Sequence, residues 1–259
     1  MTSIISIVNQ KGGVGKTTTA VNLSAGLSIL GKKALLIDID PQGNATSGLG
    51  IGKEKLVNSI YNVFIDDTPV ENTIRNTGIE NLHMIPANND LIGANVELHN
   101  IENKEKILRN KLEKARYKYD YILIDCPPSL GYLTLNALVA SDSVLIPLQC
   151  EFFAMEGLAQ LINTFNLVKS RLNNSLIIEG ILLTMFDGSA HISTEVEKEV
   201  RTHFTDKVFK TSIPRDTKLT ESPSFGKPIM LYDIISKSST AYMLLGKEVL
   251  LSNAKTNVR

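Results

Sequence analysis

The fold of this 259-residue chain is decided by the stretch Val8-Asn9-Gln10-Lys11-Gly12-Gly13-Val14-Gly15-Lys16-Thr17-Thr18-Thr19. Strand-forming residues stand before it at 4–8, and apolar residues recur at helical spacing after it, at 20–30. A strand, a glycine-rich loop and a helix in this order are the setting that a phosphate-binding loop needs. The stretch fits the motif G-x-x-x-x-G-K-S/T loosely, because Gln10 holds the first position, and fits the deviant form K-G-G-x-G-K-S/T fully. We therefore predict a P-loop with a deviant Walker A motif.

The residue types in this loop suit contact with phosphate groups. Glycines let backbone N–H groups approach phosphate oxygens, and the N-terminus of the following helix adds partial positive charge. Lys16 is expected to reach the β- and γ-phosphates, and the Thr17 hydroxyl to ligate Mg²⁺. The predicted nucleotide-binding residues of the loop are Lys11, Gly12, Gly13, Val14, Gly15, Lys16, Thr17 and Thr18.

The composition is that of an ordinary globular protein, and it argues against several classes of protein. Lys+Arg and Asp+Glu both number 27, so the formal net charge is zero and any nucleic-acid contact must come from a local patch. The two cysteines, Cys126 and Cys150, form no C-x-x-C pair, which argues against an iron–sulfur or zinc site and suits a reducing compartment. We expect no signal peptide, because the first residues have no basic segment and no long apolar run, and no stretch reaches the ~18 apolar residues of a membrane span. We expect a single domain over residues 1–259, located in the cytoplasm.

Strand and helix patterns alternate along the whole chain. Further strands are expected at 34–40, 82–86, 121–125, 144–148 and 177–184, with a short one near Val208. Further helices are expected at 104–117, 155–172, 192–204 and 239–251, with surface helices and loops over 45–80. This alternation predicts an α/β fold, a mainly parallel β-sheet with helices on both faces. Ligands bind such sheets at the carboxyl ends of the strands, where the P-loop lies.

Two acidic residues also stand where predicted strands end. Asp125 follows four apolar residues, as a Walker B acid does, and is expected to hold Mg²⁺ through a water. Asp40 ends a neighbouring strand, so its carboxylate is expected to orient or deprotonate an attacking water. An Asp before Pro is more often a turn or cap residue, but here two such acids accompany a P-loop. We predict catalytic roles for Lys16, Asp40 and Asp125, metal ligation by Thr17 and Asp125, and a structural role for Asp38.

These motifs resemble those of the ParA family of partitioning ATPases, and within it the small chromosomal, Soj-like type. The resemblance rests on residues 11–19, 38–46 and 125–129, is extended by 213–215 and 221–228, and covers about residues 3–250. It implies hydrolysis of ATP with Mg²⁺ by an ATP-dependent homodimer, in which Lys11 acts catalytically by reaching the partner's phosphates. It further implies that the dimer binds double-stranded DNA without sequence specificity and is released when a ParB-like centromere-binding protein stimulates hydrolysis.

The resemblance also implies two further sets of residues. Adenine contacts are expected from Met185, Asp187, Pro214, Arg215 and Asp216. DNA contacts are expected from Lys218, with Arg201, Arg215 and Lys227 around it, which would associate the protein with the nucleoid. Ser189 stands where a basic residue commonly follows Asp-Gly in similar proteins, so we expect weaker DNA binding. The chain begins at its first strand, so no N-terminal helix-turn-helix extension is expected.

Three other functions share the P-loop. A membrane-cycling ATPase similar to MinD needs a basic amphipathic helix at its C-terminus, whereas 250–259 is short and mostly polar, so we expect no membrane contact. A metabolic enzyme, such as an ATP-dependent ligase or a metal-cluster carrier, needs a dedicated substrate site or a C-x-x-C pair. A non-hydrolysing P-loop scaffold has no need for both Asp40 and Asp125.

Overall fold

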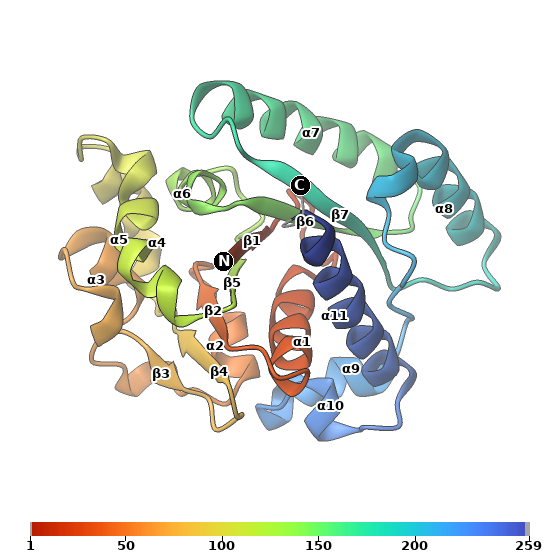
Figure 1. Ribbon diagram of the computed structural model, residues 1–259, viewed down its shortest axis with the longest axis horizontal. Helices are drawn as coiled ribbons and strands as arrows, with labels where there is room; N and C mark the ends of the chain where they lie inside the picture. Colours follow the sequence, from red (N-terminus) through yellow and green to blue (C-terminus); the bar gives the residue numbers. More distant parts are fainter. Residues whose placement is uncertain (1, 257–259) are drawn as a thin grey trace.

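One seven-stranded sheet between two layers of helices makes up the protein in the computed structural model, which describes residues 2–256 (Figure 1). The strand order is β3-β4-β2-β5-β1-β6-β7. The strands are β1 (Ser3–Ile7), β2 (Ala34–Asp38), β3 (Arg75–Asn76), β4 (Leu82–Ile85), β5 (Tyr121–Asp125), β6 (Ser143–Gln149) and β7 (Ile177–Thr184). β3 pairs antiparallel with β4 at one edge, and the other neighbours pair in parallel. The predicted α/β fold is therefore confirmed.

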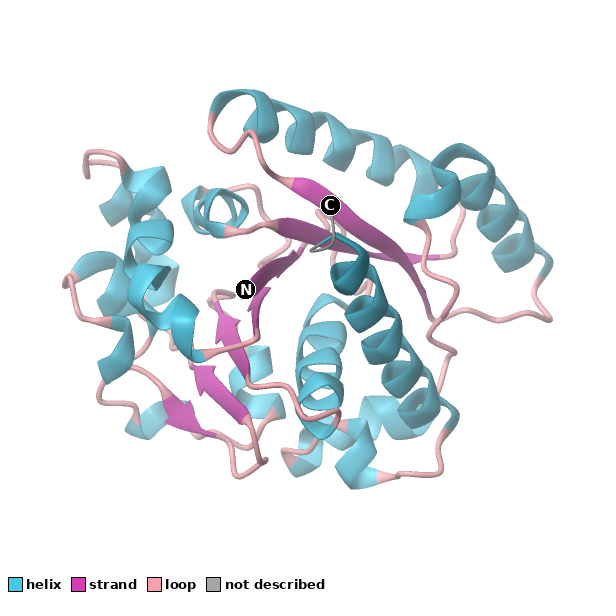
Figure 2. Cartoon of the chain, in the orientation of Figure 1, coloured by secondary structure: helices cyan, strands magenta, loops and turns pink. Residues whose placement is uncertain are grey.

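Helices cover both faces of the sheet (Figure 2). One face carries α1 (Lys16–Ile29), α2 (Asn44–Gly48), α9 (Thr217–Glu221), α10 (Ile229–Tyr232) and α11 (Lys237–Thr256). The other carries α3 (Ile60–Ile65), α4 (Leu91–Leu98), α5 (Ile107–Ala115), α6 (Tyr132–Ala140), α7 (Ala154–Arg171) and α8 (His191–Phe204). Two hydrophobic cores result, one on each side of the sheet, and this double burial explains why the central strands read as continuous apolar runs.

The packing of α1 against α11 fixes the helix that follows the P-loop. A Cβ added at Gly26 of α1 would lie 3.1 Å from Met230 Cε and 3.4 Å from the carbonyl oxygen of Tyr242. A Cβ added at Gly246 of α11 would lie 3.1 Å from Leu30 Cδ1. The two helices therefore approach closely through glycines, and α1 is buried on nearly all sides.

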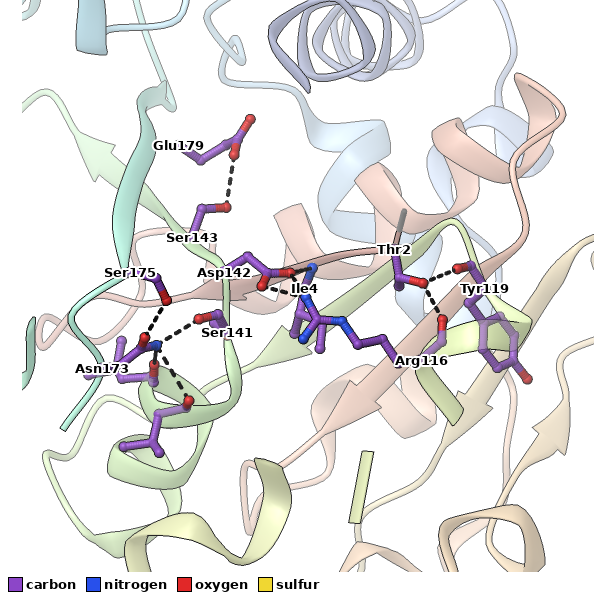
Figure 3. Close-up of polar contacts among 12 residues, drawn as sticks. Thr2, Ile4, Arg116, Tyr119, Ser141, Asp142, Ser143, Asn173, Ser175 and Glu179 are labelled. Carbon is purple, nitrogen blue, oxygen red and sulfur yellow. Dashed lines mark hydrogen bonds and ion pairs between the residues drawn. The ribbon is translucent and has the colours of Figure 1, made fainter. Parts of the chain in front are cut away.

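Polar contacts fix the amino edge of the sheet, opposite the P-loop (Figure 3). The Asp142 carboxylate accepts a hydrogen bond from the backbone N–H of Ile4 at 2.9 Å and pairs with the Arg116 guanidinium, with Nη2 2.7 Å from Oδ2. The side-chain amide of Asn173 donates to the carbonyl oxygen of Ser141 at 2.8 Å. These contacts connect the amino ends of β1 and β6 to the segments that follow α5 and α7. They help to fix the register of the strands, which aligns the carboxyl ends at the opposite end of the sheet.

Some predicted boundaries are wrong. β2 ends at Asp38 and not at Asp40, because the chain turns there and the N–H of Asp40 donates to Asp38 Oδ1 at 3.1 Å. No strand forms near Val208 in the described chain beyond an isolated bridge to Ile181. The helix predicted at 104–117 is α-helical only as α5, with 3-10 turns at Lys104–Lys106 and Arg116–Lys118.

Several elements were not expected from the sequence. The two-residue strand β3 lies within 45–80, and α4, α6, α9 and α10 fill segments without a prediction. α6 lacks an amphipathic pattern because it is buried on nearly all sides. The final helix is confirmed and is longer than expected, while 257–259 of the polar tail lie outside the described residues. Among residues 2–256, no helix has the length and apolar character to cross a bilayer.

Candidate nucleotide-binding site

The loop at 8–15 joins the carboxyl end of β1 to the N-terminus of α1. Gly13 and Gly15 have φ of +75° and +87°, a left-handed backbone that glycine adopts without strain. A Cβ placed at Gly12 or Gly13 would meet no atom within 4 Å, so the outer side of the loop is open space. Gly15 caps α1 without a side-chain hydrogen bond, and the first turn holds no acidic residue. The first N–H groups of α1 are therefore available to an anion.

Lys16 lies buried under this loop, with only 6% of its surface exposed. Its Nζ donates to the carbonyl oxygen of Lys11 at 2.9 Å. Burial lowers the pKa of the Lys16 ammonium, while the nearby Asp125 and Asp40 carboxylates raise it. A cation enclosed among the loop and two acids is placed to meet phosphate oxygens entering the loop.

Asp125 presents a buried carboxylate that makes no close hydrogen bond within the described residues, although the Thr17 hydroxyl lies near it. It is fully buried at the end of β5, and neither Oδ1 nor Oδ2 has a hydrogen-bond partner within the described residues. Burial raises its pKa well above the ordinary value, and the Asp38 carboxylate raises it further, while the Thr17 hydroxyl and the Lys16 ammonium lower it. An orphaned carboxylate beside a hydroxyl is an oxygen donor set that suits a hydrated divalent cation.

Asp38, in contrast, accepts hydrogen bonds from the protein at both of its carboxylate oxygens. It lies opposite Asp125 in the register of β2 and β5, and it accepts hydrogen bonds from the Thr46 N–H at 2.8 Å and the Thr46 hydroxyl at 2.7 Å. Burial is the main cause that raises the pKa of Asp38 to about 6. These contacts agree with the structural role that we predicted for it.

Asp40 is held at the same edge and keeps one oxygen available. Its side chain is nearly buried, and Oδ1 accepts a hydrogen bond from the N–H of Gln42 at 2.9 Å. Its Oδ2 makes no hydrogen bond in residues 2–256, so that oxygen can receive one from a water. The turn role that an Asp before Pro commonly plays is thus present, and it orients the carboxylate as well.

The two segments predicted to contact adenine lie side by side. The N–H of Phe186 donates to the carbonyl oxygen of Ile213 at 2.9 Å, and Phe186 bridges to Pro214 in parallel. Met185 adopts a φ of +50°, which is unusual for a residue with a Cβ. Two of the predicted acids have partners within the chain. Asp187 Oδ1 accepts from the Ser189 hydroxyl at 2.6 Å, and Asp216 caps α9 by accepting from the N–H of Lys218 at 3.0 Å.

The predicted DNA-contact residues do not all lie free on one surface. Lys218 is exposed, but its Nζ pairs with Glu221 Oε2 at 3.0 Å. Arg201 lies on α8, where its Nε is 2.9 Å from Glu197 Oε1 and its Nη1 donates to the carbonyl oxygen of Phe209 at 3.1 Å. Two of its three nitrogens thus donate to groups of the protein. Arg215 and Lys227 are exposed.

Sequence reasoning missed two residues that brace the loop. The Thr184 hydroxyl, at the end of β7, donates to the carbonyl oxygen of Val14 at 2.8 Å. The Asn9 amide donates to the carbonyl oxygen of Pro147 at 2.7 Å, and its Oδ1 accepts from the N–H of Lys11 at 3.0 Å. A polar residue at a strand end was the available signal for Thr184, but its partner depends on which strands become neighbours.

The sequence of this chain is similar to a known domain family and to chromosome partitioning proteins. A family model described as an AAA domain matches residues 2–178. The chain is 55% identical over 249 residues to the sporulation initiation inhibitor protein Soj of Bacillus subtilis (strain 168), which covers 96% of this chain and 98% of that protein. It is also 55% identical over 247 residues to the chromosome partitioning protein ParA of Myxococcus xanthus (strain DK1622), which covers 95% of this chain and 87% of that protein.

Solved structures confirm the fold and differ more in sequence. Cobyrinic acid a,c-diamide synthase from Mycobacterium smegmatis, with bound ATP analogue and magnesium, matches with a TM-score of 0.86 at 35% identity, covering 99% of this chain and 97% of that one. The septum site-determining protein MinD from Pyrococcus horikoshii OT3, complexed with Mg-ADP, matches with a TM-score of 0.78 at 27% identity, covering 96% of each chain. The sequence identity to Soj and ParA is therefore higher than the identity to these two solved structures.

Proposed function

The chain belongs to the ParA/Soj family of partitioning ATPases, and on this premise we propose that it is an Mg²⁺-dependent ATPase that segregates chromosomal or plasmid DNA. ATP joins two copies into a dimer that binds double-stranded DNA without sequence specificity. A ParB-like centromere-binding protein then stimulates hydrolysis and releases the dimer. The membrane-cycling alternative has weaker support, because similarity to MinD is lower.

The observation that carries the proposal is the unsatisfied carboxylate of Asp125 below the open loop of 8–15. A buried carboxylate without a close hydrogen bond in the described chain is costly in its charged form, so it is retained where a ligand satisfies it. Thr17 and Asp125 are the residues that would hold Mg²⁺. Bound Mg²⁺ neutralises charge on the β- and γ-phosphates of ATP.

The neighbouring residues divide the work of hydrolysis. Lys16 leaves the carbonyl oxygen of Lys11 and donates to phosphate oxygens, because an ammonium group is attracted more strongly to a charged oxygen than to a neutral carbonyl oxygen. Asp40, fixed by Gln42, accepts a hydrogen bond from the attacking water through its available oxygen. The segments 185–187 and 214–216 supply the adenine contacts.

The dimer completes the site. No arginine of the described chain is among the charged groups that act on Lys16 and Asp125, so we expect a further cation to come from outside. Lys11 stands at the entrance of the loop and reaches the phosphates bound by the partner, as an arginine finger does in trans. Turnover by the protein alone is therefore slow, well below the ~1 s⁻¹ that marks the lower edge of typical enzymes.

DNA binding follows from joining two modest patches. A chain with a net charge of zero holds a polyanion weakly, so a dimer that brings Lys218, Lys227 and Arg215 of both copies to one surface gains affinity. Ser189 adds no charge to this surface. The ATP-bound protein is expected on the nucleoid, and the ADP-bound protein free of it.

A mobility-shift titration on two unrelated DNA duplexes tests the proposal with ATP, with ADP and without nucleotide. We expect binding with ATP alone, equal on both duplexes and steeply dependent on salt. Equal binding in all three states rejects the dimer mechanism. No binding at low salt in any state, together with ATP-dependent sedimentation with anionic liposomes, favours the membrane-cycling alternative.

Steady-state ATP turnover, measured alone and with DNA and the ParB-like partner, tests the enzymatic part. The Lys16→Ala variant serves as the inactive control. A fast rate in the protein alone contradicts the need for a partner, and a Lys11→Ala variant with full stimulated turnover contradicts the role of Lys11 in trans.

A further inference from the structure

Lys11 is already held by a carboxylate of its own chain. Its Nζ lies 2.7 Å from Glu151 Oε2, and the two side chains are 40% and 48% exposed. Glu151 belongs to the turn between β6 and α7, which reaches the same edge of the sheet as the loop of 8–15. The catalytic scheme above gives Glu151 no role, although it pairs with the residue that has to reach the other subunit.

Both ends of this ion pair stand on a fixed backbone. The N–H of Glu151 donates to the carbonyl oxygen of Gln149 at 2.9 Å, and the Gln149 amide also contacts Glu151 Oε1. The N–H of Lys11 donates to Asn9 Oδ1 at 3.0 Å, and its carbonyl oxygen accepts from Lys16. The side chain of Lys11 is therefore the part that can change partner without a rearrangement of the loop.

The turn that carries Glu151 also exposes two aromatic side chains. Phe152 and Phe153 are 78% and 65% exposed, and their rings meet edge to face with centroids 5.1 Å apart. Large aromatic side chains are enriched where protein surfaces meet. A second copy docked at the loop edge would cover this turn, so docking would also change the environment of the Lys11–Glu151 pair.

We propose that Glu151 is a positioning residue that holds Lys11 within its own chain until a second, ATP-bound copy docks. The inference rests on the proposed function, because Lys11 must leave Glu151 to reach the partner's phosphates. The triphosphate carries more negative charge than one carboxylate, so the lysine transfers once docking brings the phosphates within its reach. Glu151 thus opposes dimers that lack ATP and sets the ATP dimer's affinity.

The size of the effect follows from the exposure of the pair. An exposed ion pair shifts an equilibrium by roughly 1.4- to 5-fold. A symmetric dimer breaks two such pairs, so Glu151→Gln is expected to tighten the dimer about 2- to 25-fold. The dissociation constant is measured by sedimentation with a non-hydrolysable ATP analogue. Glu156→Gln is the matched control, since Glu156 is an exposed acid in the first turn of α7 for which the described chain offers no ion pair.

Two further measurements separate this role from simple charge repulsion. In a Lys11→Ala background the effect of Glu151→Gln should vanish, because no lysine remains to be released. In the nucleotide-free monomer, Glu151→Gln should raise the reactivity of the Lys11 amine toward an acylating reagent, read by mass spectrometry against the other lysines. If the Lys11→Ala dimer is too weak to quantify, the measurement of Lys11 reactivity alone tests the role of Glu151.

The outcomes are distinguishable. If the wild type forms the dimer and Glu151→Gln leaves the affinity of that dimer unchanged, the positioning role is overturned and the proposed function stands. A tightening that persists without Lys11, or unchanged Lys11 reactivity, also overturns it. A wild-type protein that stays monomeric with the analogue rejects the proposed function together with the inference.

Discussion

Replacing Asp125 by asparagine should stabilise the nucleotide-free protein while removing its response to Mg-ATP. The carboxylate is fully buried, and neither of its oxygens has a partner in the described chain. Asparagine has nearly the same shape and no charge, and its side-chain oxygen can still accept a hydrogen bond from the nearby Thr17 hydroxyl. The asparagine amide is buried as well, so the gain comes from removing the charge alone. An unsatisfied charged group costs more than the about 1–3 kcal/mol of a neutral one, and we take about 2 kcal/mol for the difference. For a chain of this size, that gain raises the Tm by about 4–8 °C.

The stability that Asp125→Asn gains over the wild type should increase with pH. The pKa of Asp125 is raised in the folded protein, by burial first and by the Asp38 carboxylate second, from an unfolded value near 3.8. Below that value the carboxyl is neutral in both states, and the wild type and Asp125→Asn should have equal stability. As the pH rises toward the folded pKa, the wild type loses stability because its unfolded state releases the proton first. The advantage of the variant should therefore grow with pH and then level off.

Thermal unfolding over a pH series, with and without Mg-ATP, measures both effects. A ligand at about 100 times its dissociation constant stabilises by about 2.7 kcal/mol, and the variant should lose most of this gain. Asp206→Asn is the control, since Asp206 is exposed in the turn Thr205–Lys207 and should change neither Tm nor its pH dependence. A variant that is less stable than the wild type at every pH, or whose advantage does not vary with pH, refutes the reasoning.

Six further substitutions have defined outcomes. Lys16→Ala removes a charge-assisted contact worth about 1.5–3 kcal/mol, so titration calorimetry should show nucleotide affinity ~10- to 100-fold lower; unchanged affinity would place the phosphates elsewhere. Asp40→Ala removes the carboxylate that orients the water but leaves Lys16, Thr17 and Asp125, so light scattering with ATP should show a persistent dimer; a monomer at saturating ATP would give Asp40 a binding role instead. Lys218→Glu should weaken DNA binding equally on unrelated duplexes without loss of the ATP dimer, and Ser189→Arg should strengthen it, both read by mobility shift. Gly180→Ala places a Cβ 2.5 Å from the buried ring of Phe209 and should lower the free energy of unfolding by about 1–3 kcal/mol in a denaturant titration, whereas Gly12→Ala, whose Cβ meets nothing within 4 Å, should leave it nearly unchanged.

Elements with a strong local pattern could be predicted from the sequence. β5 and β7 have the predicted limits, because a buried strand in a parallel sheet is a continuous apolar run with a clear end. α6 escaped prediction because a helix buried on nearly all sides shows no polar face. β2 was predicted too long, since hydrogen bonding to Asp38 turns the chain two residues before the apolar pattern ends.

The sequence by itself determined the phosphate-binding loop and the acids at the strand ends, because spacing and residue type are local properties of the chain. Only the tertiary structure decided what each of these groups touches. Among the described residues it left Asp125 without a close hydrogen bond, while Asp38, at the same level of the neighbouring strand, accepts hydrogen bonds from Thr46. It brought Glu151 within 2.7 Å of Lys11 across 140 residues of sequence. Contacts of this kind depend on which strands become neighbours and in what register, and the burial that shifts the pKa of Asp125 arises only when the helices close over the sheet.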